Sequence, residues 1–207
     1  MKMRWLPILL LCLLLAGCSV ETSEGHLVPV AEGSREYSSA LDPFLPGYTL
    51  REAEDTLYGE LSQGNPVACF DVQAVPAMAR GVGRYWYPHV SATVVLAVDR
   101  TRTDAVVTGW NSLRENRVPV GMSSTSIVRN MLVLGALSYG LNPKEPSKRE
   151  ALDFLEHLCQ NGGFELEGSD APILLCLDYE AAAWNRNGGD YEIIVPVEGT
   201  LSYRMGL

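Results

Sequence analysis

The sequence predicts an α/β fold in which helices cover both faces of a parallel sheet. Several short runs are apolar throughout, among them residues 93–98 and 173–177, and such runs predict strands that are buried on both faces. These runs alternate with segments that carry apolar residues at helical spacing, of which residues 127–137 are the longest. The chain has 207 residues, 47% of them hydrophobic, which is sufficient for a sizeable core.

The first residues predict export and lipidation. Lys2 and Arg4 precede an apolar run, residues 5–15, that is too short to span a bilayer comfortably. The small-residue sequence Leu15-Ala16-Gly17-Cys18 follows, and this pattern resembles a bacterial lipoprotein signal. We therefore expect a signal peptide at 1–17 and a lipid anchor (palmitate) on Cys18. The anchor would hold the protein on the outer face of the cytoplasmic membrane, at the cell surface or in the periplasm. An ordinary signal peptide with an incidental cysteine is the alternative.

Charge and cysteine content exclude several classes of function. Without Lys2 and Arg4 the chain keeps 14 basic residues against 25 acidic ones, a net charge of −11, and no basic cluster that would favour nucleic acid. Cys69, Cys159 and Cys176 remain after processing, and they have no metal-ligand spacing. We therefore expect no metal and no cofactor, and we interpret these cysteines as small buried apolar residues whose disulfide state is open.

The elements of the first half follow in order. Residues 18–37 read as a flexible tether, because residues 20–37 are polar and irregular. Thr49 and Glu52 have capping-box spacing and predict a helix with Leu50, Ala53, Leu57 and Leu61 on one face. Residues 67–70 predict a short strand with Asp71 at its end, and residues 72–80 a helix. The loop 81–89 holds Tyr85, Trp86 and Tyr87, which could stack on a ligand, although packing is the favoured interpretation.

The second half continues the alternation. Residues 118–122 predict a strand, Ser123-Ser124-Thr125-Ser126 a turn, and residues 127–137 a helix. Ser147 and Glu150 have capping-box spacing at the start of the next helix. Residues 173–177 predict a strand that ends at Asp178-Tyr179, residues 180–184 a short helix, and residues 193–195 a last strand.

Polar residues at the strand ends form the candidate site. In open α/β sheets ligands bind beyond the carboxyl ends of strands, and Asp71, the serine turn at 123–126 and Asp178 with Tyr179 lie at three such ends. The serines could be helix caps only, or they could bind an anion with the N-terminus of their helix. Ser123, His89 and Asp178 could form a hydrolase triad, but no nucleophile-elbow motif surrounds Ser123, so we expect no enzyme.

Together these motifs resemble a type 2 solute-binding protein of an ABC importer, of the polyamine- and iron-binding branches. The resemblance rests on the strand 93–99, Gly109-Trp110-x-x-Leu113, the helices after Val118, the strand ending at Asp178-Tyr179, and residues 193–201 with their Pro-x-Glu-Gly. It implies two α/β lobes that close on a small-molecule solute without catalysis and deliver it to a membrane permease. It also implies ligand contacts from Ser123, Ser124, Asp178 and Tyr179 in the second lobe, from Asp71 in the first, and from Glu198 at the hinge.

One departure from that family shapes the expected architecture. In the family the chain returns to complete the first lobe, whereas here it stops at Leu207. We therefore expect a partial first lobe with a hinge strand at 38–105, a complete second lobe at 106–192, and a return crossing at 193–207 that lies beside the outgoing strand near Val95. A truncated gene product, a short relative, a vestigial or structural lipoprotein and a secreted hydrolase stay as alternatives. The charge of the solute stays open, because the serines favour an anionic or carboxylate ligand, whereas the acidic and aromatic residues favour a polyamine or another cation.

Overall fold

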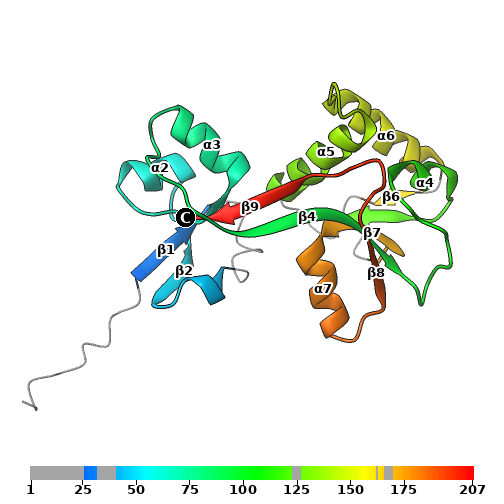
Figure 1. The fold of residues 1–207 in the computed structure, drawn as a ribbon, viewed down its shortest axis with the longest axis horizontal. Coiled ribbons are helices and arrows are strands. Elements are labelled where there is room, and N and C mark those ends of the chain that lie inside the picture. Colours follow the sequence, from blue (N-terminus) through cyan, green and yellow to red (C-terminus); the bar gives the residue numbers. More distant parts are fainter. Residues whose placement is uncertain (1–25, 32–40, 123–126, 162, 166–169) are drawn as a thin grey trace, which may run out of the picture.

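The computed structural model describes residues 26–31, 41–122, 127–161, 163–165 and 170–207. Two groups of elements lie at opposite ends of a β ribbon made of strands β4 (Pro88–Asp99) and β9 (Ser202–Gly206) (Figure 1). We call the group formed by residues 26–31 and 41–87 the small lobe. The group that contains helices α4 to α7 is the large lobe.

Strand β4 runs through both groups, because its two halves have different partners. Residues 90–93 pair with β9, and Val94–Val98 pair with β7 (Ile173–Leu177). On the other edge Leu96 pairs with Ile194 of β8 (Tyr191–Ile194). The predicted contact between the outgoing strand and the segment near Ile194 is therefore confirmed.

The sheet is mixed, so the α/β class is confirmed while the prediction of a parallel sheet is wrong. The strand order is β3-β9-β4-β7-β5-β6, and β8 also pairs with β4. Strand β5 (Val120–Met122) is parallel to β6 (Phe164–Glu165) and to β7, but β4 is antiparallel to each of its partners. A continuously apolar run reports burial on both faces and carries no information on strand direction.

Helices cover both faces of the sheet in the large lobe. On one face α4 (Trp110–Glu115), α5 (Ile127–Leu141) and α6 (Lys148–Asn161) bury Trp110, Leu137 and Phe154 against Leu96 and Leu175. On the other face, α7 (Asp178–Arg186) packs Ala181 and Trp184 onto Val95, Ala97 and Cys176. Successive residues of β4 thus enter different cores, as the period of two in a strand requires.

The small lobe corrects two predictions. Strand β1 (His26–Val30) lies within the expected tether and buries Val28 and Val30 while it pairs with β2 (Tyr48–Glu52). Residues 48–52 are therefore a strand and not the start of a helix. The helix α2 (Leu57–Ser62) begins later, where Thr56 Oγ1 accepts a hydrogen bond from Gly59 N at 3.2 Å. The pairing of residues 48–52 with β1, which is distant in the sequence, thus determines their structure more strongly than the local capping pattern does.

Two other small-lobe elements match their expected positions, because strand β3 (Cys69–Phe70) leads into helix α3 (Asp71–Ala79). A one-turn 3-10 helix, η2 (Asp42–Phe44), precedes β2. Within the described residues no helix combines the length and apolar character needed to cross a bilayer.

Candidate functional site

The carboxyl ends of strands from both lobes face one another across the middle of β4. Phe70, the last residue of β3, pairs with Met205, which pairs with Val90. Leu177, the last residue of β7, pairs with Val94. Because β3 and β4 are both antiparallel to β9, β3 runs toward the large lobe, whereas β7 runs toward the small lobe. The two ends are four positions apart along β4, roughly 13 Å. We call this stretch of β4, residues 90–94, together with the paired residues of β9, the waist.

The first predicted site residue, Asp71, lies at the small-lobe side of the waist and contacts β9. Its Oδ2 accepts a hydrogen bond from Arg204 N at 3.1 Å and lies 3.6 Å from Arg204 Nε. The Asp71 side chain is 17% exposed and that of Arg204 is 57% exposed. The Arg204 guanidinium also lies 5.6 Å from the centre of the Trp86 ring. The Asp71 carboxylate is thus paired with Arg204, while the Arg204 side chain remains largely exposed to solvent.

One face of the waist is lined with hydroxyl groups. Ser91 pairs with Arg204, and Thr93 pairs with Ser202, so all four side chains project from the same face of the ribbon. The hydroxyls of Thr93 and Ser202 are 2.8 Å apart and hydrogen-bonded. Ser91, Ser202 and Arg204 are exposed. This face can offer hydroxyl groups and one guanidinium to a polar molecule.

The opposite face of the waist is closed by the large lobe. Ala92 and Tyr203 pair there and are both buried, and Tyr203 Oη donates a hydrogen bond to Leu132 O of α5 at 2.8 Å. Burial, followed by the charge of Asp71, raises the pKa of Tyr203 to about 12. The Tyr203 hydroxyl therefore stays protonated and serves as a donor near neutral pH.

Asp178 and Tyr179 begin α7 on the large-lobe side of the waist. Asp178 Oδ1 accepts a hydrogen bond from Tyr179 N at 2.8 Å, and the Tyr179 ring packs against the main core. Glu180, next in the chain, accepts from Leu177 N at 2.8 Å and from Arg129 Nη2 of α5 at 2.9 Å. Arg129 is 1% exposed, so a buried ion pair fixes the starts of α5 and α7 relative to one another.

Glu198 lies on the return segment after β8, where it caps helix α4. Its carboxylate accepts hydrogen bonds from Trp110 N at 3.0 Å and from Asn111 N at 2.8 Å. The indole of the buried Trp110 donates to Gly199 O at 2.8 Å. A side chain on Gly109 would collide with the Glu198 carboxylate, so the Gly109-Trp110 pair allows this close approach. In this structure Glu198 therefore serves as the N-terminal cap of helix α4.

Other predicted residues lie elsewhere. Ser123 and Ser124 fall outside the described residues, although the adjoining strand β5 is parallel to β7 and so also ends toward the small lobe. His89 lies at the start of β4, with its ring 6.4 Å from that of Phe44. It is five positions from Val94, roughly 16 Å along the strand, so it does not pair with Asp178. Among the described residues, no group of three or more His, Cys, Asp or Glu side chains could hold a metal ion.

Comparisons with known proteins identify the fold. The sequence matches no family model and no curated protein. The structure is similar to the sulfate-binding protein SubI of Mycobacterium tuberculosis H37Rv, with TM-score 0.59 and 17% identity over 87% of this chain and 73% of that one. It is also similar to a putative spermidine/putrescine ABC transporter of Listeria monocytogenes, with TM-score 0.57 and 12% identity over 89% and 72%. Iron-bound HitA of Pseudomonas aeruginosa gives TM-score 0.53 and 12% identity over 87% and 74%. The chain therefore has the α/β fold of periplasmic solute-binding proteins.

Proposed function

We propose that this protein is the solute-binding component of an ABC importer, which holds a small solute at the waist and closes its lobes around it without catalysis. The observation that carries the proposal is the direction of the strands: β3 ends toward the large lobe, whereas β5 and β7 end toward the small lobe, so strand ends from both lobes face one another across the waist. The fold shared with binding proteins of this kind supports it. A membrane permease would be the partner.

The proposed solute contacts come from both sides of the waist. Asp178, Tyr179, Ser123 and Ser124 would contribute from the large lobe, Asp71 from the small lobe, and Glu198 from the return segment. We add Ser91, Thr93 and Arg204, because these side chains project from the solvent-facing side of the ribbon. Since Asp71 is already paired with Arg204, the structure supports a polar solute bound largely by hydroxyl groups more than a strongly cationic one.

Thermal unfolding in the presence of candidate solutes tests the proposal. The panel takes its members from the names of structurally similar proteins: spermidine, putrescine, sulfate, iron, fructose 6-phosphate and GABA. A solute at 100 times its dissociation constant stabilises by about 2.7 kcal/mol, which should raise Tm by roughly 5–10 °C in a chain of this size. Asp178→Asn should reduce the shift. The exposed Asp153→Asn on α6 should keep it. A folded protein that none of these solutes stabilises would contradict the proposed solute class.

We further propose that Cys18 carries the lipid that anchors the protein to the membrane. The lipoprotein signal in the sequence supports this. In cells, the wild-type protein should sediment with membranes and incorporate labelled palmitate, whereas Cys18→Ser should do neither. Unlabelled wild-type protein in the soluble fraction would refute the anchor.

A further inference from the structure

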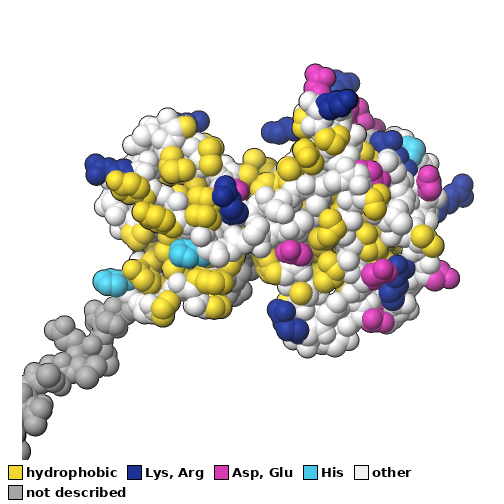
Figure 2. Space-filling view, viewed as in Figure 1, with side chains coloured by type: hydrophobic (Ala, Val, Ile, Leu, Met, Phe, Trp, Pro, Cys, Tyr) yellow, Lys and Arg dark blue, Asp and Glu magenta, His cyan; other side chains and the backbone are white. Residues whose placement is uncertain are grey.

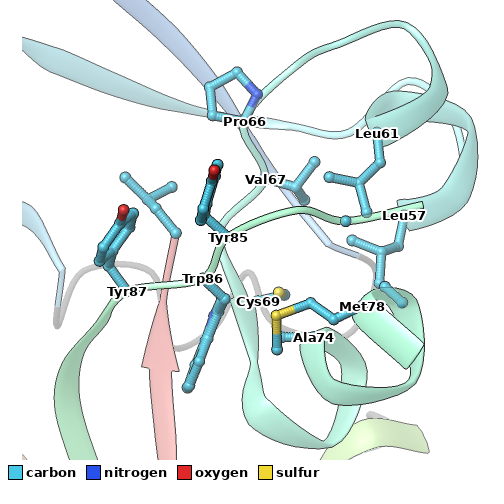
Figure 3. A pocket seen from close by; sticks show the side chains of 13 residues that line it. Leu57, Leu61, Pro66, Val67, Cys69, Ala74, Met78, Tyr85, Trp86 and Tyr87 are labelled. Atoms are coloured by element: carbon cyan, nitrogen blue, oxygen red, sulfur yellow. The ribbon is translucent and has the colours of Figure 1, made fainter. Parts of the chain in front are cut away.

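The small lobe contains a cavity, separate from the waist. It has a volume of about 210 Å³ and lies between α2, β3, α3 and the loop before β4 (Figure 3). Leu57 and Leu61 of α2, Val67 and Cys69 of the β3 segment, and Ala74 and Met78 of α3 form its walls. Except for Leu207 after β9, the described residues that line it all belong to the small lobe. The space-filling view shows many apolar side chains on this lobe (Figure 2).

Backbone hydrogen bonds hold in place the loop that lines this cavity. The loop after α3 is held by hydrogen bonds from Val82 N and Gly83 N to Ala77 O at 3.1 and 3.3 Å. At the other end of the loop, Leu207 N donates to Tyr87 O at 3.1 Å, which fixes the loop to the end of β9. Backbone hydrogen bonds therefore attach one end of this loop to α3 and the other end to the residue after β9.

The lining defines the chemistry of a ligand. Among the described residues, none of those that line the cavity has a charged side chain. Burial raises the pKa of the Cys69 thiol to about 12, so this wall is also neutral near pH 7. At the rim Tyr85 and Tyr87, 77% and 64% exposed, lie with their ring centres 6.5 Å apart. An apolar cavity of about 150 Å³ remains dry and binds benzene, so this one can take a somewhat larger ring system.

We propose that this cavity is a binding site for a neutral, apolar molecule of one or two aromatic rings. The ligand enters past the two tyrosines and replaces the void with contacts to the aliphatic walls. This site is distinct from the waist, whose exposed face carries hydroxyls and a guanidinium, and it does not depend on the solute-binding proposal.

Toluene tests the proposal with the full chain, and benzoate is the charged probe of similar size. In protein labelled with ¹³C-methyl methionine, toluene should shift the Met78 methyl signal, which Met78→Leu assigns. Benzoate should not. Ala74→Leu, which adds bulk to the wall, should abolish the toluene shift, and Leu61→Phe serves as a second filling variant if the first does not fold. Leu152→Phe on α6, 55% exposed in the large lobe, should keep the shift. An unshifted Met78 signal in folded wild-type protein overturns the proposal. So does a shift that persists in a folded filling variant.

Discussion

Glu198 provides the sharpest test of how the return segment is held. Its carboxylate accepts two backbone hydrogen bonds at the start of α4, a helix of six residues that has little stability by itself. Loss of an N-terminal capping side chain costs about 0.5–2 kcal/mol, and a hydrogen bond to a charged group contributes about 1.5–3 kcal/mol. We therefore expect Glu198→Ala to lower the free energy of unfolding by about 2–3 kcal/mol. Glu198→Gln, which keeps one acceptor oxygen, should cost about half as much.

Urea unfolding followed by circular dichroism, without any solute, measures these differences. Asp153→Asn is the matched control, because its side chain is 66% exposed and lies 4.0 Å from Arg149, where a surface pair contributes at most about 0.5 kcal/mol. If Glu198 served only to contact a solute, its removal would leave the unliganded protein as stable as the control. A Glu198→Ala variant within about 0.5 kcal/mol of wild type would therefore refute the capping role.

Three further predictions concern the buried polar groups and the thiols. A hydrogen bond from Asn65, and further ones from the Glu54 backbone and Arg51, lower the pKa of Glu60 against the opposing effect of burial. This stabilisation is present above the unfolded pKa of about 4.3 and is lost as pH falls through the folded value, so Glu60→Gln should flatten the acid decline of Tm. Glu180→Ala leaves the buried Arg129 without this carboxylate and should cost about 3–5 kcal/mol in urea unfolding. Cys159 is exposed, so the interpretation of all three cysteines as buried residues is wrong for this one. Among the described cysteines, maleimide should therefore label Cys159 in the native protein and spare the buried Cys69 and Cys176, as peptide mass spectrometry would show.

The sequence predicted the large lobe better than the small one, for a physical reason. Strand β7 is wholly apolar, and helices α5 and α6 are long, so the local sequence of each element is sufficient to predict its burial. Strands β1 and β2 are half exposed and depend on each other, 22 residues apart in their pairing. Local patterns at Thr49 and Glu52 therefore pointed to a helix that the long-range pairing replaced.

The same limit applies to the candidate site. Asp71 and Asp178 could be found, because each directly follows an apolar strand. Arg204 and Ser91 could not be placed beside them, since only the register between β4 and β9 brings them together. A signal for β9 was present in the alternation of Ser202, Tyr203, Arg204 and Met205. The capping role of Glu198 has no local signal, because it is 88 residues from Trp110.

The two faces of the waist determine in which direction the lobes can move. On one face Tyr203 is buried and hydrogen-bonded to Leu132 of α5, so rotation toward that side would compress a packed contact. On the other face Ser91, Ser202 and Arg204 are exposed to solvent. The lobe closure that we propose should therefore bend the ribbon toward the hydroxyl-lined face, where Ser91, Ser202 and Arg204 are exposed. Tyr203→Phe removes the hydrogen bond from Tyr203 Oη to Leu132 O and keeps the ring, so it should loosen the contact between the ribbon and α5 without changing the polar face. In small-angle scattering of the unliganded protein, this variant should show a different radius of gyration from wild type. An unchanged radius would contradict a role for this hydrogen bond in holding the ribbon against α5.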